Sequence, residues 1–153
     1  MKYSGTLIAV SDMEQSKAFY CNVLGLKVID DFGANVMLED GIFLQTMDTW
    51  KAFIRNEHVT LQNNAYELYF EERDMDAFLE HLSQFEISYI HEPLVHNWGQ
   101  RVVRFYDLDH HIIEVAEEIT MVVKRFVDSG MTEEETAKRM DVPIDYVQKC
   151  LKK

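Results

Sequence analysis

Apolar and polar residues alternate with a period of two along Arg101–Tyr106 and again along Ile112–Glu117. This period predicts two β-strands, each with one packed face and one face of different chemistry. Between them, the Asp107-Leu-Asp-His110 segment is rich in residues whose short side chains bind nearby backbone N–H groups. The two strands are therefore expected to form a hairpin.

One residue of this hairpin does not suit an ordinary packed strand. Glu114 is a carboxylate that stands between Ile113 and Val115. A charged group among apolar neighbours has to face solvent or a cavity that supplies a partner. Glu114 is therefore a candidate site residue.

The first fifty residues predict a strand, a helix and three further strands. Ser11 or Asp12 is expected to cap the helix, which ends near Leu24 because Gly25 follows. The four strands are expected at 6–10, 26–29, 35–38 and 42–46. The next stretch, 47–64, is a polar connector with a short helix around 49–54.

The same order returns in residues 65–117. A strand at 65–70 precedes a helix that Asp74 caps, and a short strand at 88–90 and a loop at 91–100 lead into the hairpin. Two copies of one β-α-β-β-β unit predict an α+β fold, in which two half-sheets pair and leave a cleft.

Residues 118–153 carry a different pattern, which predicts three helices. They are expected at 119–129, at 132–140 with a Thr-x-x-Glu capping box, and at 142–151. The spacing of the last two resembles a helix-turn-helix. We therefore divide the chain into a domain at 1–117, with modules at 1–50 and 65–117, and a helical C-terminal appendage at 118–153.

Charge is distributed unevenly between these parts. Residues 1–117 hold 20 acidic and 8 basic residues, whereas 118–153 hold 7 of each. An acidic body repels phosphates, so nucleic acid is an unlikely partner. The last predicted helix carries Asp145 and Lys149 before the terminal lysines, so the appendage is expected to serve packing or oligomerisation.

Composition places the chain among globular proteins. It has 153 residues, of which 47% are hydrophobic and 27% charged, enough for one domain with a core. It shows no long apolar run and no signal-peptide pattern, so a cytoplasmic location is expected. Cys21 and Cys150 lie far apart, which favours neither a disulfide framework nor a zinc knuckle.

Several motifs resemble the vicinal oxygen chelate superfamily of glyoxalases, bleomycin-resistance proteins and extradiol dioxygenases. The opening of that family is matched by Val10–Met13, by Ser16–Tyr20 in the helix and by Val23–Lys27. Its closing Asp-Pro-Asp-Gly-x-x-x-Glu motif is matched by Phe105–Glu114, with Leu108 and His110 replacing Pro and Gly. The resemblance covers about residues 1–117. It implies a cup of two modules, small-molecule ligands and a possible homodimer.

The resemblance also implies a divalent metal in the cup, such as Zn, Ni, Mn, Co or Fe. Its usual ligand positions fall on Gly5, Gln45, Glu67 and Glu114. Glycine has no ligating side chain and none of the four is a histidine. Glu67, Glu114 and Gln45 are the candidate ligands, and Glu67 and Glu114 the candidate catalytic acid and base. Alternatively, the two carboxylates are polar walls satisfied by Arg104, Tyr69 or water.

Ligand contacts are expected from side chains around the cavity and its rim. Trp98 and His96 either close over a ligand or pack their loop onto the sheet. Arg104 either binds a substrate anion or neutralises Glu67 or Glu114. The full set of candidate ligand-binding residues is Arg104, Trp98, His96, Tyr69 and Phe43.

Two functions fit this pattern. The first is a glyoxalase-like lyase or isomerase that acts on a vicinal-oxygen substrate through a metal. The second is a metal-free protein of the bleomycin-resistance type that sequesters its ligand without turnover. A ligand-sensing regulator would additionally require the tail to contact DNA or a partner.

Overall fold

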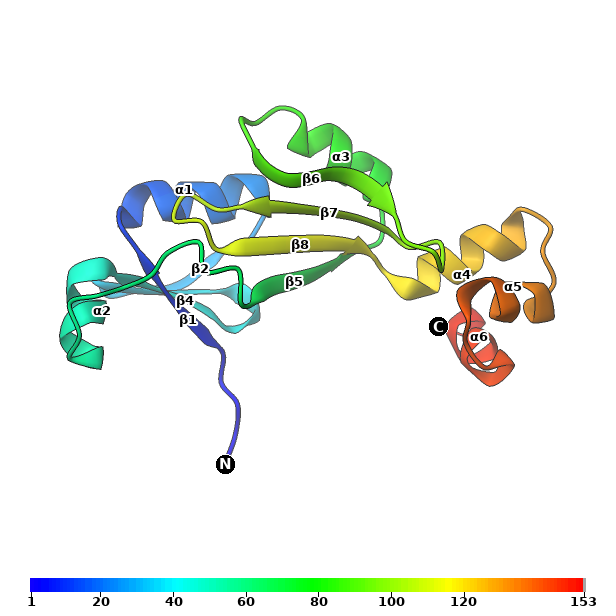
Figure 1. Ribbon diagram of the computed structural model, residues 1–153, viewed down its shortest axis with the longest axis horizontal. Helices are drawn as coiled ribbons and strands as arrows, with labels where there is room; N and C mark the ends of the chain where they lie inside the picture. Colours follow the sequence, from blue (N-terminus) through cyan, green and yellow to red (C-terminus); the bar gives the residue numbers. More distant parts are fainter. Residues whose placement is uncertain (153) are drawn as a thin grey trace. The chain divides into compact units, whose positions relative to one another are not determined.

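Two β-α-β-β-β units follow one another in the computed structural model, which describes residues 1–152 (Figure 1). The first consists of β1 Thr6–Val10, α1 Met13–Val23, β2 Val28–Asp31, β3 Asn35–Leu38 and β4 Ile42–Thr46. The second consists of β5 Glu67–Glu72, α3 Met75–Leu82, β6 Ser88–Val95, β7 Arg101–Tyr106 and β8 Ile112–Glu117. The repeat and the α+β class are therefore confirmed.

Both sheets use the same strand order. The first is β1-β4-β3-β2 and the second is β5-β8-β7-β6, so in each the first and last strands of the unit are neighbours. In the first sheet β1 pairs in parallel with β4, and β3 is antiparallel to β2 and β4. A short 3-10 turn, Glu39–Gly41, separates β3 from β4, and α2, Met47–Ile54, follows β4.

Three strand boundaries were predicted wrongly. β2 begins at Val28 because Gly25 turns the chain with a positive φ and Leu26 packs into the core before the strand starts. β5 begins at Glu67 because the Ala65 N–H bonds to the side chain of Asn63 in a local turn. β6 continues through most of the predicted loop at 91–100, to Val95; it is an edge strand, the position at which a sheet accommodates a proline such as Pro93.

Strand periodicity puts the core of the second sheet on one face. Leu68, Val103, Phe105, Ile113 and Val115 share one strand phase and are all buried. Met75 and Leu82 of α3 are buried as well. The other face of these strands carries the polar residues Glu67, Arg104 and Glu114, together with the buried Val102 and Ala116.

The turn between β7 and β8 belongs with the first unit, which contains Met1–Tyr66 and Tyr106–Ile112. The buried carboxylate of Asp107 accepts hydrogen bonds from the Tyr20 hydroxyl at 2.7 Å and from the His111 N–H at 2.8 Å. Asp109 accepts bonds from the Ser11 N–H and hydroxyl. Burial, followed by the charge of Asp107, raises the pKa of the Tyr20 hydroxyl well above its usual value. These aspartates bind the turn to Ser11, which precedes α1, and to Tyr20 within α1.

His110 lies in the turn between β7 and β8. It is exposed and has a φ of 63°, as expected where the family motif has glycine.

The tail folds as the predicted three helices: α4 Ile119–Asp128, α5 Glu133–Met140 and α6 Ile144–Leu151. They enclose a core that contains Val122, Val123, Ala137, Met140, Val147 and Cys150. The capping box is present, with Thr132 and Glu135 bonded to each other's backbone N–H groups. Within residues 1–152 no helix is long and apolar enough to cross a membrane.

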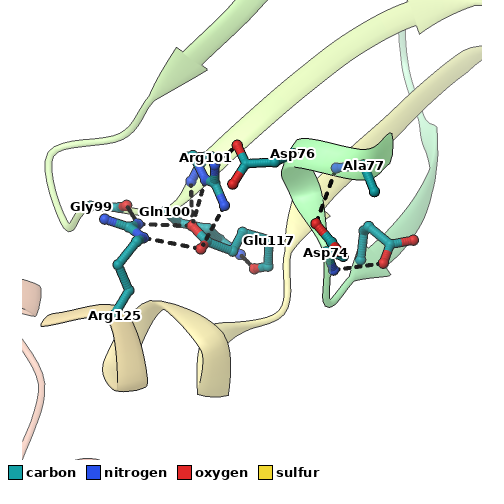
Figure 2. A network of polar contacts seen from close by, with 9 residues as sticks. Asp74, Asp76, Ala77, Gly99, Gln100, Arg101, Glu117 and Arg125 are labelled. Carbon is teal, nitrogen blue, oxygen red and sulfur yellow. Dashed lines mark hydrogen bonds and ion pairs between the residues drawn. The ribbon is translucent and has the colours of Figure 1, made fainter. Parts of the chain in front are cut away.

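A network of charges joins the tail to the second sheet (Figure 2). Glu117, the last residue of β8, is 1% exposed and accepts bonds from Arg101 of β7 and Arg125 of α4. Burial would raise the pKa of Glu117, but the bonds from Arg125 and Arg101 outweigh it and the pKa is lowered. The carboxylate is thereby held ionised between strand and helix.

The Tyr20–Asp107 bond predicts a stability loss. Tyr20→Phe should lower the free energy of unfolding by about 1–2 kcal/mol, because a buried carboxylate loses a donor. Urea unfolding measures this as a lower midpoint with an unchanged slope. Tyr106→Phe is the matched control, because its hydroxyl bonds to Asn64 at an exposed position. Equal effects of the two substitutions would contradict the assigned role of Tyr20.

Candidate functional site

A row of polar side chains crosses the second sheet, with one residue from each strand. In spatial order they are Glu67 of β5, Glu114 of β8, Arg104 of β7 and His91 of β6. Glu67, Glu114 and Arg104 stand in the strand phase opposite to Leu68, Ile113, Val115, Val103 and Phe105, as the period of two predicts. Residues far apart in the chain are therefore brought together on one face.

Arg104 is the centre of this row. Its Nε donates to Glu67 Oε2 at 2.9 Å, and its Nη2 forms an ion pair with Glu114 Oε2. Its Nη1 lies 3.4 Å from His91 Nε2. The guanidinium thus neutralises both carboxylates, which was one of the two roles predicted for Arg104.

The two carboxylates differ in their access to solvent. The Glu114 side chain is 7% exposed, and its Oε2 forms no hydrogen bond within residues 1–152, so the guanidinium of Arg104 is its counter-charge. The Glu67 side chain is 34% exposed. Glu114 is consequently a buried charge that depends on its ion pair, and Glu67 has a face free for another partner.

The turn between β6 and β7 supplies the aromatic part of the site. The rings of His96 and Trp98 stack, with centroids 4.2 Å apart and planes inclined by 20°. Burial lowers the pKa of His96, and the nearby charges of Arg104 and His91 lower it further. The indole Nε1 of Trp98 donates to Gln100 Oε1 at 3.0 Å.

Tyr69 and Glu71 extend the same face along β5. Both are exposed, whereas Leu68 between Glu67 and Tyr69 is buried. The Tyr69 hydroxyl donates to Glu71 Oε1 at 3.1 Å. An acidic and aromatic strip therefore borders the row that Arg104 organises.

Gln45 and Phe43 lie on β4 of the first unit. The Gln45 amide oxygen accepts from Asn35 Nδ2 at 2.8 Å, and its nitrogen donates to Ala34 O and to the Thr49 hydroxyl. Both ends of this amide are engaged in local structure.

Gly5 is explained by its close approach to the chain at Gly41. It has a φ of +147°, and a Cβ there would overlap the Gly41 carbonyl oxygen and the Phe43 ring. A ligating side chain at this position would require the backbone to shift.

These arrangements do not fit a metal. Glu67 and Glu114 are already paired with a guanidinium, and Gln45 is held by three local partners. No group of three or more His, Cys, Asp or Glu in the described part of the chain is arranged to hold a metal ion. The ligand set of Glu67, Glu114 and Gln45 stays a prediction that the side-chain contacts do not favour.

The second unit brings together Glu67, Tyr69, His96, Trp98, Arg104 and Glu114 of the predicted site. Sequence reasoning missed His91, Glu71 and Gln100 as members. His91 was placed in a loop because the strand was ended too early at Ile90. The apolar residues Leu94 and Val95 beyond it were the sequence signal that the strand continues.

Comparisons with known proteins identify the family. The sequence model of the glyoxalase-like domain matches residues 3–120, most of the chain. A comparison with curated proteins finds no match. The chain belongs to the glyoxalase-like domain family.

Solved structures of other proteins have a similar fold. A protein of unknown function from Agrobacterium tumefaciens is 35% identical, with a TM-score of 0.70 and coverage of 77% of this chain and 94% of that one. A glyoxalase/bleomycin resistance protein/dioxygenase family enzyme from Burkholderia phytofirmans is 15% identical, with a TM-score of 0.63 and coverage of 74% and 96%. A lactoylglutathione lyase from Agrobacterium tumefaciens is 20% identical, with a TM-score of 0.60 and coverage of 77% and 94%.

The ion pair predicts strong coupling between Arg104 and Glu114. Arg104→Gln should destabilise the fold by about 3 kcal/mol, because it leaves a buried carboxylate without a counter-charge. Adding Glu114→Gln should recover part of that loss, with a coupling energy above about 1 kcal/mol by urea unfolding of the double-mutant cycle.

The exposed pair Lys27–Glu39 provides the control cycle. Its coupling should stay below about 1 kcal/mol. Additive effects at Arg104 and Glu114 would show that the guanidinium does not compensate this carboxylate.

Proposed function

We propose that this protein binds a small planar cation on the polar face of its second sheet, without a metal, as a sequestration protein of the bleomycin-resistance type. The observation that carries the proposal is that Arg104 forms ion pairs with Glu67 and Glu114. Because the Arg104 guanidinium already balances the charge of Glu67 and Glu114, no metal ion is required between these two carboxylates.

Charge supports a cationic ligand. An anion would need Arg104, but the guanidinium is turned to Glu67, Glu114 and His91. Glu67 keeps an exposed side, and Glu71 is exposed four residues further along β5. The excess of acidic residues in 1–117 would also raise the local concentration of cations.

The aromatic residues support a planar ligand. Trp98 is 40% exposed and Tyr69 is 51% exposed, so both rings have surface left for a contact. Aromatic faces attract cations and stack on flat groups. Phe43 stays a predicted ligand contact in the first unit, and the homodimer stays an expectation from the family.

The alternative is the metal-assisted lyase or isomerase, with Glu67 and Glu114 as acid and base. It requires Arg104 to leave Glu114 so that a metal can enter. The lactoylglutathione lyase supports the shared fold and, at 20% identity, no more than that. Metal uptake and turnover would distinguish this function from sequestration.

Binding can be tested by calorimetry with proflavine as a planar cation and 2-naphthalenesulfonate as an aromatic anion. We expect proflavine to bind and the anion not to bind. Glu71→Gln should weaken proflavine about 2- to 5-fold, the range of an exposed charge contact. Trp98→Leu should weaken it about 3- to 30-fold through the lost cation–π contact.

Glu80→Gln serves as the matched control, because this exposed carboxylate lies on α3 and not on the polar face. It should bind proflavine as the wild type does. Preference for the anion would contradict the proposal. Stoichiometric uptake of Zn²⁺ or Mn²⁺ that Glu114→Gln abolishes would support the enzyme instead.

A further inference from the structure

His96 and Trp98 lie in the turn His96–Gln100. The backbone hydrogen bonds within this turn join only its own residues. The His96 N–H bonds to Gln100 O at 2.9 Å, and the Gly99 N–H bonds to His96 O at 2.8 Å. Such a short turn between an edge strand and its neighbour has few contacts of its own to fix its direction. Its remaining contacts come from the tail.

Two tail arginines bind the turn through its backbone. Arg125 of α4 donates from Nη2 to the Gly99 carbonyl at 2.7 Å. Arg139 of α5 donates from Nη1 to the Asn97 carbonyl. Charged donors make stronger bonds to carbonyl groups than neutral ones do.

Phe126 of α4 fills the space between these arginines and the turn. The guanidinium carbons of Arg125 and Arg139 lie 5.2 and 5.6 Å from its ring centroid. A Cβ at Gly99 would overlap the ring, so Phe126 packs directly on the glycine backbone. Gly99 also has a φ of +92°, which only glycine adopts readily.

Contacts alternate along the turn. Asn97 and Gly99 bind the tail, whereas His96 and Trp98 stack on each other and His96 lies within the electrostatic influence of Arg104. The tail therefore holds the turn through the residues that the site does not use. His96 and Trp98 remain available to a ligand.

A second connection runs from Trp98 to the start of the tail. The Trp98 indole donates to the Gln100 side chain, whose Nε2 donates to the Glu117 carbonyl at 2.8 Å. Glu117 is the residue that Arg101 and Arg125 hold between β7 and α4 (Figure 2). Trp98 is thus linked to the junction where the tail leaves the sheet.

We infer that the three-helix tail is a positioning device, in which Arg125, Phe126 and Arg139 fix the His96–Gln100 turn and thereby place Trp98 and His96 over the binding face. The family match ends at residue 120, so these three residues lie outside it. The inference rests on the proposed function for what the placed rings bind, but the placement itself is a separate claim.

Arg139→Gln tests the placement with little risk to the fold, because Arg139 is exposed. Lys138→Gln is the matched control, since it removes the same charge from the neighbouring exposed position. All variants carry Trp50→Phe, so that fluorescence reports Trp98 alone. A third variant, Arg125→Lys, keeps a charge beside Glu117 but loses the planar fork that also reaches Gly99.

We expect acrylamide to quench Trp98 more strongly in Arg139→Gln and Arg125→Lys than in Lys138→Gln. The pKa of His96, followed by NMR, should move up toward its usual value as the ring leaves its site. Proflavine should bind about 3- to 10-fold more weakly, because the turn then has to be ordered on binding. Thermal unfolding of Arg139→Gln should match that of Lys138→Gln.

Identical quenching and His96 titration in Arg139→Gln and Lys138→Gln would overturn the inference. If the wild type binds no proflavine, the proposed ligand class fails, but quenching and titration still decide whether the tail positions the turn. If proflavine binds and the tail variants change neither quenching nor affinity, the proposed function stands and the positioning role is excluded.

Discussion

The buried negative charge of Glu114 is the constraint on which the binding face depends. A carboxylate that is 7% exposed cannot remain ionised among apolar strands without a counter-charge, and Arg104 supplies it from the adjacent strand. The same guanidinium contacts Glu67, so one cation fixes residues from three strands. Once Arg104 is used in this way, the groups left on this face for the proposed ligand are acidic and aromatic. The proposed preference for a planar cation follows from this internal pairing.

The structure also separates two roles that the hairpin motif combines. Asp107 and Asp109 are bound by Tyr20 and Ser11 and hold the turn in the first unit. Glu114, further along β8, belongs to the polar face of the second sheet. At the end of the same strand, Glu117 binds Arg101 and Arg125 and connects the tail. Four acidic residues of one segment therefore stabilise a turn, the polar face of the second sheet and a helical junction.

Much of the fold could be predicted because it depends on local patterns. Period-two alternation identified both hairpin strands and the side of the sheet that Arg104, Glu67 and Glu114 share, and helix caps located the helices of the tail. What could not be predicted depends on pairing in space. β6 continues past Pro93 because it is an edge strand, and its edge position is a property of the sheet. Whether Arg104 or a metal lies beside the carboxylates depends on the direction of a long side chain. The hydrogen bond from Arg139 to the Asn97 carbonyl joins residues that share no local sequence pattern.

The central claim is that Arg104, rather than a metal ion, lies between Glu67 and Glu114. The most direct test is a crystal structure of protein purified without chelator and then soaked in Mn²⁺, with anomalous data collected for manganese. We expect guanidinium density bonded to both carboxylates and no anomalous peak beside Glu114. A peak within bonding distance of Glu114, with Arg104 displaced, would contradict it.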